Sequence, residues 1–282
     1  MPGKGDPNWR KAAVCYQRAR VHRFLGRTDR AIELCHAATA LADYNKAHAL
    51  LAQMELPGPD YFSLLARIHA YLRPGTYVEI GVSRGESLRL AHAGTDCIGI
   101  DPAPRPKTPP GPRQRIFAEK SDDFFASRDV VAELGGRRIE LAFIDGMHRF
   151  EFALRDFMNI ERHCEPSAIV LIHDCYPLDA ATATRERHTS FWSGDIWRLI
   201  LALKKYRPDL KVHTIGTAPT GLGVITNLDP SSRVLSDALD RIIAEYLATD
   251  YSILEGRKSE LLGLYPNHWP AIRALIDASQ PG

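Results

Sequence analysis

The stretch Glu79-Ile80-Gly81-Val82-Ser83-Arg84-Gly85-Glu86-Ser87 stands where the chain changes from helical to strand-like patterning. The apolar run Tyr77–Ile80 predicts a buried strand, and the spacing that follows predicts a helix near Glu86–His92. Gly81 allows a sharp turn and a close approach of a ligand to the backbone. The N-terminus of the expected helix would offer free N–H groups. The stretch therefore predicts a ligand-binding turn between a first strand and a helix.

Short apolar runs alternate with helical stretches after this point. The runs are Tyr77–Ile80, Cys97–Ile100, Gln114–Phe117, Leu141–Ile144 and Ala168–Ile172, and further helices are expected near Asp122–Leu134 and Phe150–His163. Such alternation indicates a parallel sheet covered on both faces. Two more runs, Lys211–Ile215 and Leu222–Thr226, are joined by a connection too short for a helix and so predict an antiparallel pair. We expect an α/β fold: a Rossmann-like, doubly wound sheet with a terminal antiparallel hairpin.

The flanking regions have helical spacing and no strand-like runs. Gly26 and the segment Pro57-Gly58-Pro59 separate the expected N-terminal helices, and helices are also expected at Val234–Tyr246 and Lys258–Leu264. The segment Pro102–Pro112 holds six prolines and predicts an irregular loop. The division that follows is a helical N-terminal region over 1–70, an α/β domain over 71–228 and a C-terminal helical extension over 229–282.

The N-terminal region has a weak internal pattern of its own. Gly26, Ala31, Ile32 and Ala38 fall at offsets that resemble one tetratricopeptide repeat. Solenoids need about three or more repeats, so one repeat leaves several roles open. These are a helical cap on the α/β domain, a homo-oligomer contact, and a protein-binding surface.

Composition narrows the class of protein. The net charge is +2, which predicts neither a nucleic-acid partner nor an anionic membrane partner. No apolar stretch reaches the ~18 residues of a membrane span. The five cysteines, at positions 15, 35, 97, 164 and 175, include no Cys-x-x-Cys pair. We therefore expect a cytoplasmic protein without a structural disulfide.

Asp101 adds a second element to the glycine turn. It ends the second expected strand, 20 residues after Gly81, where a carboxylate can accept both ribose hydroxyls of an adenine nucleoside. A dinucleotide fingerprint would need glycine at position 83 and glycine or alanine at position 86, but the chain has Ser83 and Glu86. The pattern disfavours a nicotinamide oxidoreductase.

These residues resemble a known family. The pattern Glu-x-Gly-x-x-x-Gly over 79–85, followed by Asp101, resembles the nucleoside site of class I methyltransferases, which use S-adenosylmethionine (SAM). The run Phe143–His148, followed by Ile172-His173-Asp174, resembles the branch that contains small-molecule and sugar O-methyltransferases with an Ile-Asp-Gly-x-His motif. The resemblance covers roughly 150 residues and implies SAM as cofactor.

The resemblance also implies a set of cofactor contacts. It assigns the methionine part of SAM to the first acid and the glycine turn, ribose to the second acid, and adenine to residues after the third strand. The expected contacts are Glu79, Gly81, Gly85, Ser87, Asp101, Ser121, Asp122 and Asp145. Ser121 and Asp122 could instead form only the capped, acidic first turn of a helix.

The expected chemistry lies at the ends of the fourth and fifth strands. Asp145 and Asp174 close these strands, and neighbouring strand ends line one crevice in a doubly wound sheet. With His148 and His173 they could hold a divalent cation, Mg²⁺ or Mn²⁺, or accept the proton of a hydroxyl group. We assign catalytic roles to His148, His173 and Asp174.

The metal ligands expected are Asp145 and Asp174, and the third ligand is open. Metal-dependent relatives carry Asp followed by Asn or Asp at the end of the fifth strand, whereas Cys175 follows Asp174 here. A thiolate is a poor ligand for magnesium. Either His148 or His173 completes the site, or no metal binds. Two simpler interpretations also stand: Asp145 as a helix cap, and His173 as a buried histidine beside the sheet.

Residues near the expected site carry further predictions. In the stretch Phe191–Trp197, Trp192 is either an acceptor wall or a packing residue, and Trp197 is expected to dock a helix on the sheet. The polar loop Tyr176–Ser190 could close over a substrate. Arg155 and Asp156 are expected on a solvated helix face.

Together these features predict a SAM-dependent methyltransferase that transfers a methyl group to a hydroxyl of a small-molecule or glycosidic acceptor. The alternative is a non-catalytic SAM-binding or protein-binding module that uses the N-terminal helices.

Overall fold

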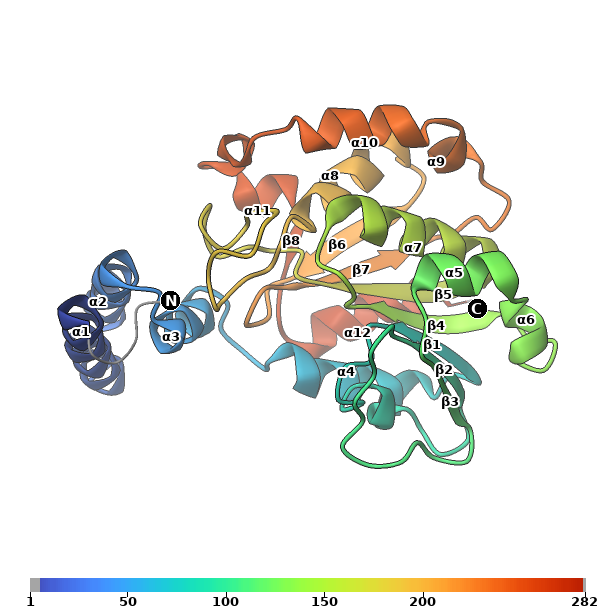
Figure 1. The fold of residues 1–282 in the computed structure, drawn as a ribbon, viewed down its shortest axis with the longest axis horizontal. Coiled ribbons are helices and arrows are strands. Elements are labelled where there is room, and N and C mark those ends of the chain that lie inside the picture. The colour runs from blue at the N-terminus through green and yellow to red at the C-terminus, as the bar shows by residue number, and fades with distance from the viewer. Residues whose placement is uncertain (1–5, 281–282) are drawn as a thin grey trace.

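A mixed eight-stranded sheet forms the centre of the molecule in the computed structural model, which describes residues 6–280 (Figure 1). The strand order is β3-β2-β1-β4-β5-β7-β6-β8. The strands are β1 (Thr76–Ile80), β2 (Asp96–Ile100), β3 (Gln114–Phe117), β4 (Ile139–Ile144), β5 (Cys164–His173), β6 (Lys211–Ile215), β7 (Leu222–Thr226) and β8 (Leu264–Tyr265). Strands β1 to β5 pair in parallel, and β7 runs antiparallel to both β5 and β6. The predicted Rossmann-like α/β fold with its terminal hairpin is confirmed.

Helices cover both faces of this sheet. The helices of the described chain are α1 (Pro7–Phe24), α2 (Thr28–Leu41), α3 (Asn45–Glu55), α4 (Tyr61–Leu72), α5 (Ser121–Ser127), α6 (Val130–Glu133), α7 (Phe150–His163), α8 (Trp197–Tyr206), α9 (Val234–Asp237), α10 (Leu239–Leu247), α11 (Lys258–Leu261) and α12 (Trp269–Asp277). Figure 1 shows α7, α8 and α10 above the sheet and α4 and α12 below it. None of the helices within residues 6–280 is long and apolar enough to cross a membrane.

The two apolar cores follow from the period of two in the strands. Val78 packs into the core shared with α7 and α8, while its neighbour Tyr77 packs into the core shared with α4 and α12. Successive side chains of a strand point to opposite faces, so continuously apolar strands need a helical layer on each side. This explains why the parallel strands read as unbroken apolar runs in the sequence.

The N-terminal helices pack on one another and on a loop that follows β5. Helices α1 and α2 are joined by a turn at Gly26, which has a φ of 72°. Their core, which includes Leu34 and Leu51, also contains Leu178 and Phe191 from the loop. In Figure 1 these helices lie apart from α5 and α6, at the other end of the molecule.

Two helix predictions within the α/β region need correction. The helix expected near Glu86–His92 is only the 3₁₀ turn η1 (Leu88–Leu90), because the backbone becomes extended at Ala91, with a ψ of 141°. The helix N-terminus expected to offer N–H groups is therefore absent from this part of the described chain. The expected helix Asp122–Leu134 is broken into α5 and α6, because Asp129 caps a new helix.

The C-terminal region departs from prediction in a similar way. The helix expected over Val234–Tyr246 is divided into α9 and α10. The helix expected over Lys258–Leu264 stops at Leu261, because Gly263 turns the chain with a φ of 64°. Leu264–Tyr265 then pairs in parallel with β6 as strand β8. The pairing partner lies about fifty residues earlier in the sequence, so the local pattern gives no sign of this strand.

Gly81 lies in close contact with the backbone at the end of β4. Its φ is 93°, and a β-carbon there would lie 2.0 Å from the carbonyl oxygen of Asp145. Gly135 also has a positive φ, 68°, but a β-carbon there would meet nothing within 4 Å. Alanine variants at the two glycines therefore distinguish the cost of backbone strain, which both share, from the cost of steric overlap, which only Gly81 has.

We predict that Gly135→Ala lowers the free energy of unfolding by about 1–2 kcal/mol, the cost of a left-handed backbone. Gly81→Ala should cost about 2 kcal/mol more, because the end of β4 must also move. Urea unfolding of both variants measures the difference. Equal losses would contradict the close approach of Gly81 to Asp145.

Candidate functional site

A cavity of about 770 Å³ runs along the carboxyl edge of the sheet. Its lining residues are Asn45, Ile80, Gly81, Ser83, Ile100, Asp101, Pro102, Lys120, Ser121, Asp122, Asp145, Gly146, Met147, His148, Phe152, Asp156, His173, Asp174, Ser190, Phe191, Trp192, Pro219 and Thr220. The strand order gives the cavity a direction. The ends of β1, β2 and β3 form one end, β4 and β5 the middle, and the β6–β7 turn the other end.

Asp101 lies at the first end, as predicted. Its two carboxylate oxygens accept hydrogen bonds from the backbone N–H groups of Ser83 and Ala103, each at 2.7 Å. A carboxylate has about four acceptor positions, so both oxygens can still accept further hydrogen bonds. Gly81 lines the same part of the cavity. The turn and the acid therefore meet, as a nucleoside site requires.

Glu79 has a different place from the one predicted. It is fully buried, does not line the cavity, and accepts hydrogen bonds from the hydroxyls of Tyr77 at 2.7 Å and Ser87 at 2.8 Å. Burial raises its pKa to about 8, against the opposing effect of these hydrogen bonds. Gly85 and Ser87 also lie outside the lining. Glu79, Gly85 and Ser87 therefore support the turn and do not face the cavity.

Ser121 and Asp122 line the cavity and also occupy the first turn of α5. Asp122 forms a bidentate ion pair with Arg155, with N–O distances of 2.9–3.1 Å. The acidic first turn is therefore present, but Lys120 is the N-cap residue and no side chain caps the helix. A contact of Ser121 or Asp122 with adenine stays a prediction. Asp122 has less hydrogen-bonding capacity left for a ligand than Ser121.

Asp156 corrects the prediction of a solvated helix face. It is 3% exposed, lines the cavity and lies within hydrogen-bonding distance of Ser121. Burial raises its pKa to about 7, and its Oδ1 atom has no hydrogen-bond partner among the described residues. The signal was present in the sequence: Asp156 lies three residues after Ala153 and four before Ile160, both buried on α7.

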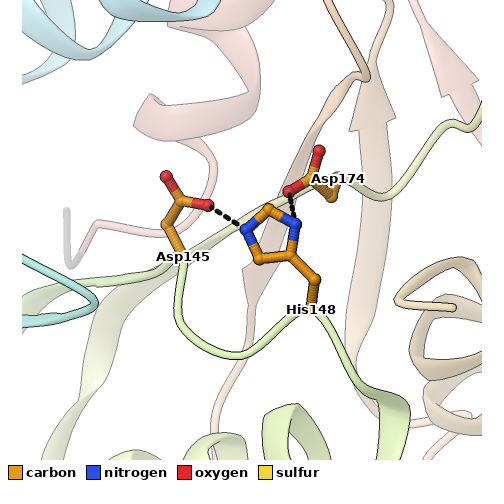
Figure 2. Close-up of side chains that lie close together, drawn as sticks. All are labelled: Asp145, His148 and Asp174. Carbon is orange, nitrogen blue, oxygen red and sulfur yellow. Dashed lines mark ion pairs between the residues drawn. The ribbon is translucent and has the colours of Figure 1, made fainter. Parts of the chain in front are cut away.

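Two carboxylates and two imidazoles converge in the middle of the cavity. His148 Nδ1 lies 3.0 Å from Asp174 Oδ2, and His148 Nε2 lies 3.5 Å from Asp145 Oδ1 (Figure 2). His173 Nδ1 lies 3.2 Å from Asp145 Oδ1 and 3.3 Å from Asp174 Oδ2. The strand ends thus bring together the four residues that the sequence assigned to chemistry. We call these four residues the Asp–His cluster.

The cluster is electrostatically balanced. Burial by itself would raise the pKa values of Asp145 and Asp174, but the charge of His173 and hydrogen bonds from both histidines hold them below their usual range. Burial by itself would lower the pKa values of His148 and His173, but the two aspartates raise both. The aspartates and the histidines therefore favour one another's charged forms.

The same donor atoms suit a divalent cation. Asp145, His148 and Asp174 each offer one ligand atom, and these atoms lie within 4.8 Å of one another. Carboxylate oxygens suit Mg²⁺ and Mn²⁺, and imidazole suits softer divalent ions. Cys175 is buried, lies outside the lining and donates its thiol to the carbonyl of Ile172. The residues present fit a cation without the cysteine.

The backbone around His148 is held in an unusual conformation. His148 and Asp174 have φ angles of 55° and 62°, which cost about 1–3 kcal/mol each and need support from their surroundings. A β-carbon at Gly194 would lie 1.9 Å from the carbonyl oxygen of His148. Asp195, fully buried, donates its N–H to that oxygen at 3.2 Å and accepts a hydrogen bond from Phe150 N at 2.7 Å.

Sequence reasoning missed several residues of this site. In the sequence, Gly194 and Asp195 stand out only as part of the aromatic stretch Phe191–Trp197, and Asn45 is far from the other residues of the site along the chain. Thr220 donates to Asp174 Oδ1 at 2.6 Å, and the ring of Tyr61 packs on His173 with centroids 4.1 Å apart. No local pattern marks these residues, because each reaches the site through tertiary packing.

Trp197 and Trp192 have different positions, and the sequence analysis allowed for both. Trp197 is buried at the start of α8, as expected for a docking residue. Trp192 lines the cavity and stacks on His148, with ring centroids 5.3 Å apart and an interplanar angle of 9°.

Each of the five cysteines falls within residues 6–280 and is a free thiol there.

Comparison with known proteins adds one family match. Residues 78–175, from β1 to the residue after Asp174, match the model of a family described as a methyltransferase domain. This segment contains Gly81, Asp101 and the whole Asp–His cluster. No curated protein matches the chain.

Three similar solved structures are methyltransferases. A Podospora anserina methyltransferase bound to S-adenosylhomocysteine (SAH) is 14% identical, over 81% of this chain and 98% of that chain, with a TM-score of 0.46. The O-methyltransferase TomG from Streptomyces achromogenes, involved in tomaymycin synthesis and solved with SAM, is 16% identical over 64% and 86%, with a TM-score of 0.44. An O-methyltransferase from Bacillus cereus in complex with SAH is 12% identical over 62% and 85%, with a TM-score of 0.43.

The raised pKa of Glu79 predicts a pH dependence of stability. An unfolded glutamate loses its proton near pH 4.3, whereas burial raises the pKa of folded Glu79 to about 8. The folded state therefore keeps a proton that the unfolded state has lost, and stability falls as pH rises between these two values.

Glu79→Gln cannot ionise and should remove this fall. We expect the free energy of unfolding of the variant to decline less than that of the wild type between pH 5 and pH 8, measured by urea unfolding. Glu255→Gln, at an exposed position, is the control. Parallel curves for wild type and Glu79→Gln would show that Glu79 ionises normally.

Proposed function

We propose that the protein is a SAM-dependent methyltransferase that transfers a methyl group to a hydroxyl of a neutral small-molecule or glycosidic acceptor. The observation that carries the proposal is one continuous cavity with a nucleoside-type end at Gly81 and Asp101 and the Asp–His cluster in its middle. Both features lie within the segment that matches the methyltransferase-domain model.

The cofactor would occupy the end formed by β1, β2 and β3. Asp101 would accept the ribose hydroxyls, and the glycine turn would let the chain of SAM pass close to the backbone. Ser121 and the unpartnered Oδ1 of Asp156 are the polar groups available to adenine. This assignment keeps Gly81, Asp101, Ser121 and Asp145 from the sequence prediction and adds Asp156.

The Asp–His cluster would activate the acceptor. A hydroxyl is a weak nucleophile until it loses its proton, and a base placed at hydrogen-bonding distance accelerates this loss. Without a cation, His148, which borders the open cavity, would accept the proton of the hydroxyl after first releasing the ring proton that the two aspartates favour, while Thr220 holds Asp174 from behind. With a divalent cation, Asp145, Asp174 and His148 would hold it, and its Lewis acidity toward the hydroxyl oxygen would take the place of the histidine base.

The remaining end of the cavity indicates the kind of acceptor. Near the β6–β7 turn the described lining consists of Asn45, Ser190, Phe191, Trp192, Pro219 and Thr220. None of these side chains carries a formal charge, so this part of the lining offers no ion pair to a charged acceptor. An uncharged acceptor with hydroxyl groups and a ring or apolar face fits this surface better than an anion.

Several predictions from the sequence stay predictions. They are the boundaries 1–70, 71–228 and 229–282, the cytoplasmic location, the absence of nucleic-acid and membrane partners, and a homo-oligomer contact through the helical regions. The non-catalytic alternative is separated from an enzyme by one measurement, the production of SAH with any acceptor.

The cofactor assignment predicts selective binding. Calorimetry should detect SAM and SAH but not NAD. Asp101→Ala should weaken SAM binding by about 1–3 kcal/mol, because hydrogen-bonded ribose hydroxyls would lose their acceptor. Asp237→Ala, an exposed residue of α9 outside the cavity lining, should leave SAM affinity unchanged. Unchanged affinity in a folded Asp101→Ala protein would remove the ribose assignment.

The chemical assignment predicts a separate effect on turnover. Neutral hydroxylated compounds would be screened for SAH production, and Asp174→Ala and His148→Ala should lower kcat by about 10²–10⁴-fold while SAM affinity changes little. Chelation should lower activity, and Mg²⁺ or Mn²⁺ should restore it. Full activity after exhaustive chelation would leave a histidine base without a cation. Near wild-type turnover in both variants would remove the proposed catalytic site.

A further inference from the structure

Asp43 connects the N-terminal helices to the loop that borders the cavity. It lies between α2 and α3, and its carboxylate accepts two hydrogen bonds from Ser190, from the backbone N–H at 2.8 Å and from the hydroxyl at 3.0 Å. The two residues are 147 positions apart in the sequence. Both oxygens of Asp43 are engaged with one residue, so the loop is fixed in position and orientation.

Phe191, the next residue, is anchored in the N-terminal helices. It is 7% exposed and packs in the core that contains Leu34 and Leu51. Its ring also stacks on that of His48, with centroids 5.6 Å apart and an interplanar angle of 18°. The helices thus provide the main apolar contact of this loop segment.

Trp192 carries the connection to the Asp–His cluster. Its indole N–H donates to the carbonyl of Thr184 at 2.6 Å, and its ring lies flat against His148. Figure 2 shows His148 with its two ring nitrogens directed at Asp145 and Asp174. A flat contact on an imidazole held at both nitrogens limits the tilt of its ring. The orientation of His148 therefore depends on where Trp192 is held.

Helix α3 also contributes a residue to the cavity itself. Asn45, in the first turn of α3, lines the same cavity as Ser190 and Trp192. The N-terminal helices therefore supply a cavity wall as well as the support for the loop.

We propose that the N-terminal helices are a working part of the candidate active site, with Asp43 as a positioning residue that holds Trp192 against His148 through Ser190. The catalytic part of this inference rests on the proposed function, whereas the positioning itself does not. It disfavours the interpretation of these helices as an independent protein-binding module.

The test is hydroxyl-radical footprinting of the full chain, read out by mass spectrometry at single residues. Asp43→Ala should raise the labelling rates of Trp192 and Phe191 severalfold and leave residues of β4 and β5 unchanged. Asp43→Asn keeps an oxygen that accepts from Ser190 N and should restore much of the protection. Asp29→Ala, an exposed aspartate of α2, is the matched control and should resemble the wild type.

A kinetic measurement completes the test. With an acceptor from the screen, Asp43→Ala should lower kcat while calorimetry finds SAM affinity unchanged, and Asp43→Asn should recover turnover. If Asp43→Ala does not fold, Ser190→Ala removes one of the two hydrogen bonds from the other side and should give a smaller increase in Trp192 labelling.

Two outcomes overturn the proposal. One is unchanged labelling of Trp192 and Phe191 in both Asp43→Ala and Ser190→Ala. The other is increased labelling throughout β4 and β5, which would make Asp43 a residue of general stability. Because footprinting needs neither SAM nor an acceptor, a failure of SAM binding would refute the proposed function and still leave the positioning of Trp192 decided.

Discussion

Two buried carboxylates, Asp145 and Asp174, cannot both stay charged beside each other unless positive charge lies within a few ångströms. The chain supplies it from His148 and His173, and much of the surrounding architecture serves to keep these four side chains in place. Adjacent parallel strands bring the two aspartates together, and left-handed backbone at His148 and Asp174 turns the side chains inward. Gly194 gives the space and Asp195 the hydrogen bond that this backbone needs. A divalent cation would bring the same two positive charges that the imidazoles bring.

The parts of the molecule that the sequence predicts well are those governed by local periodicity. All seven predicted strands exist, because each is a short run rich in apolar or β-branched residues and is separated from the next by a turn or a helical stretch. Asp101, Asp145 and Asp174 were found because a strand end in a doubly wound sheet has a known place relative to the crevice. The prediction of the site thus rested on position along strands, and strand position is a local property.

The errors occurred where a distant contact decides the local conformation. The segment Glu86–His92 forms only the short turn η1, since Ser87 is held by the buried Glu79 and the backbone is extended at Ala91. Glu79 was assigned to the cofactor because its position in the motif suggested it, but its hydrogen-bond partners, Tyr77 and Ser87, are visible only in three dimensions. Asn45 lines the cavity and Asp43 holds Ser190, both from another region of the chain, and a single sequence carries no record of such contacts.

The positions of strand β8 and helix α12 bear on the order in which parts of the molecule can fold during synthesis. β8 covers the outer side of β6, and Ile272 and Ile276 of α12 pack in the same core as Leu65 of α4. Until residues 264–277 are made and dock, β6 presents an open edge and α4 an uncovered apolar surface, the two features that promote aggregation of nascent chains. Strand β8 and helix α12 therefore act as a cover that closes parts of the fold made earlier in synthesis.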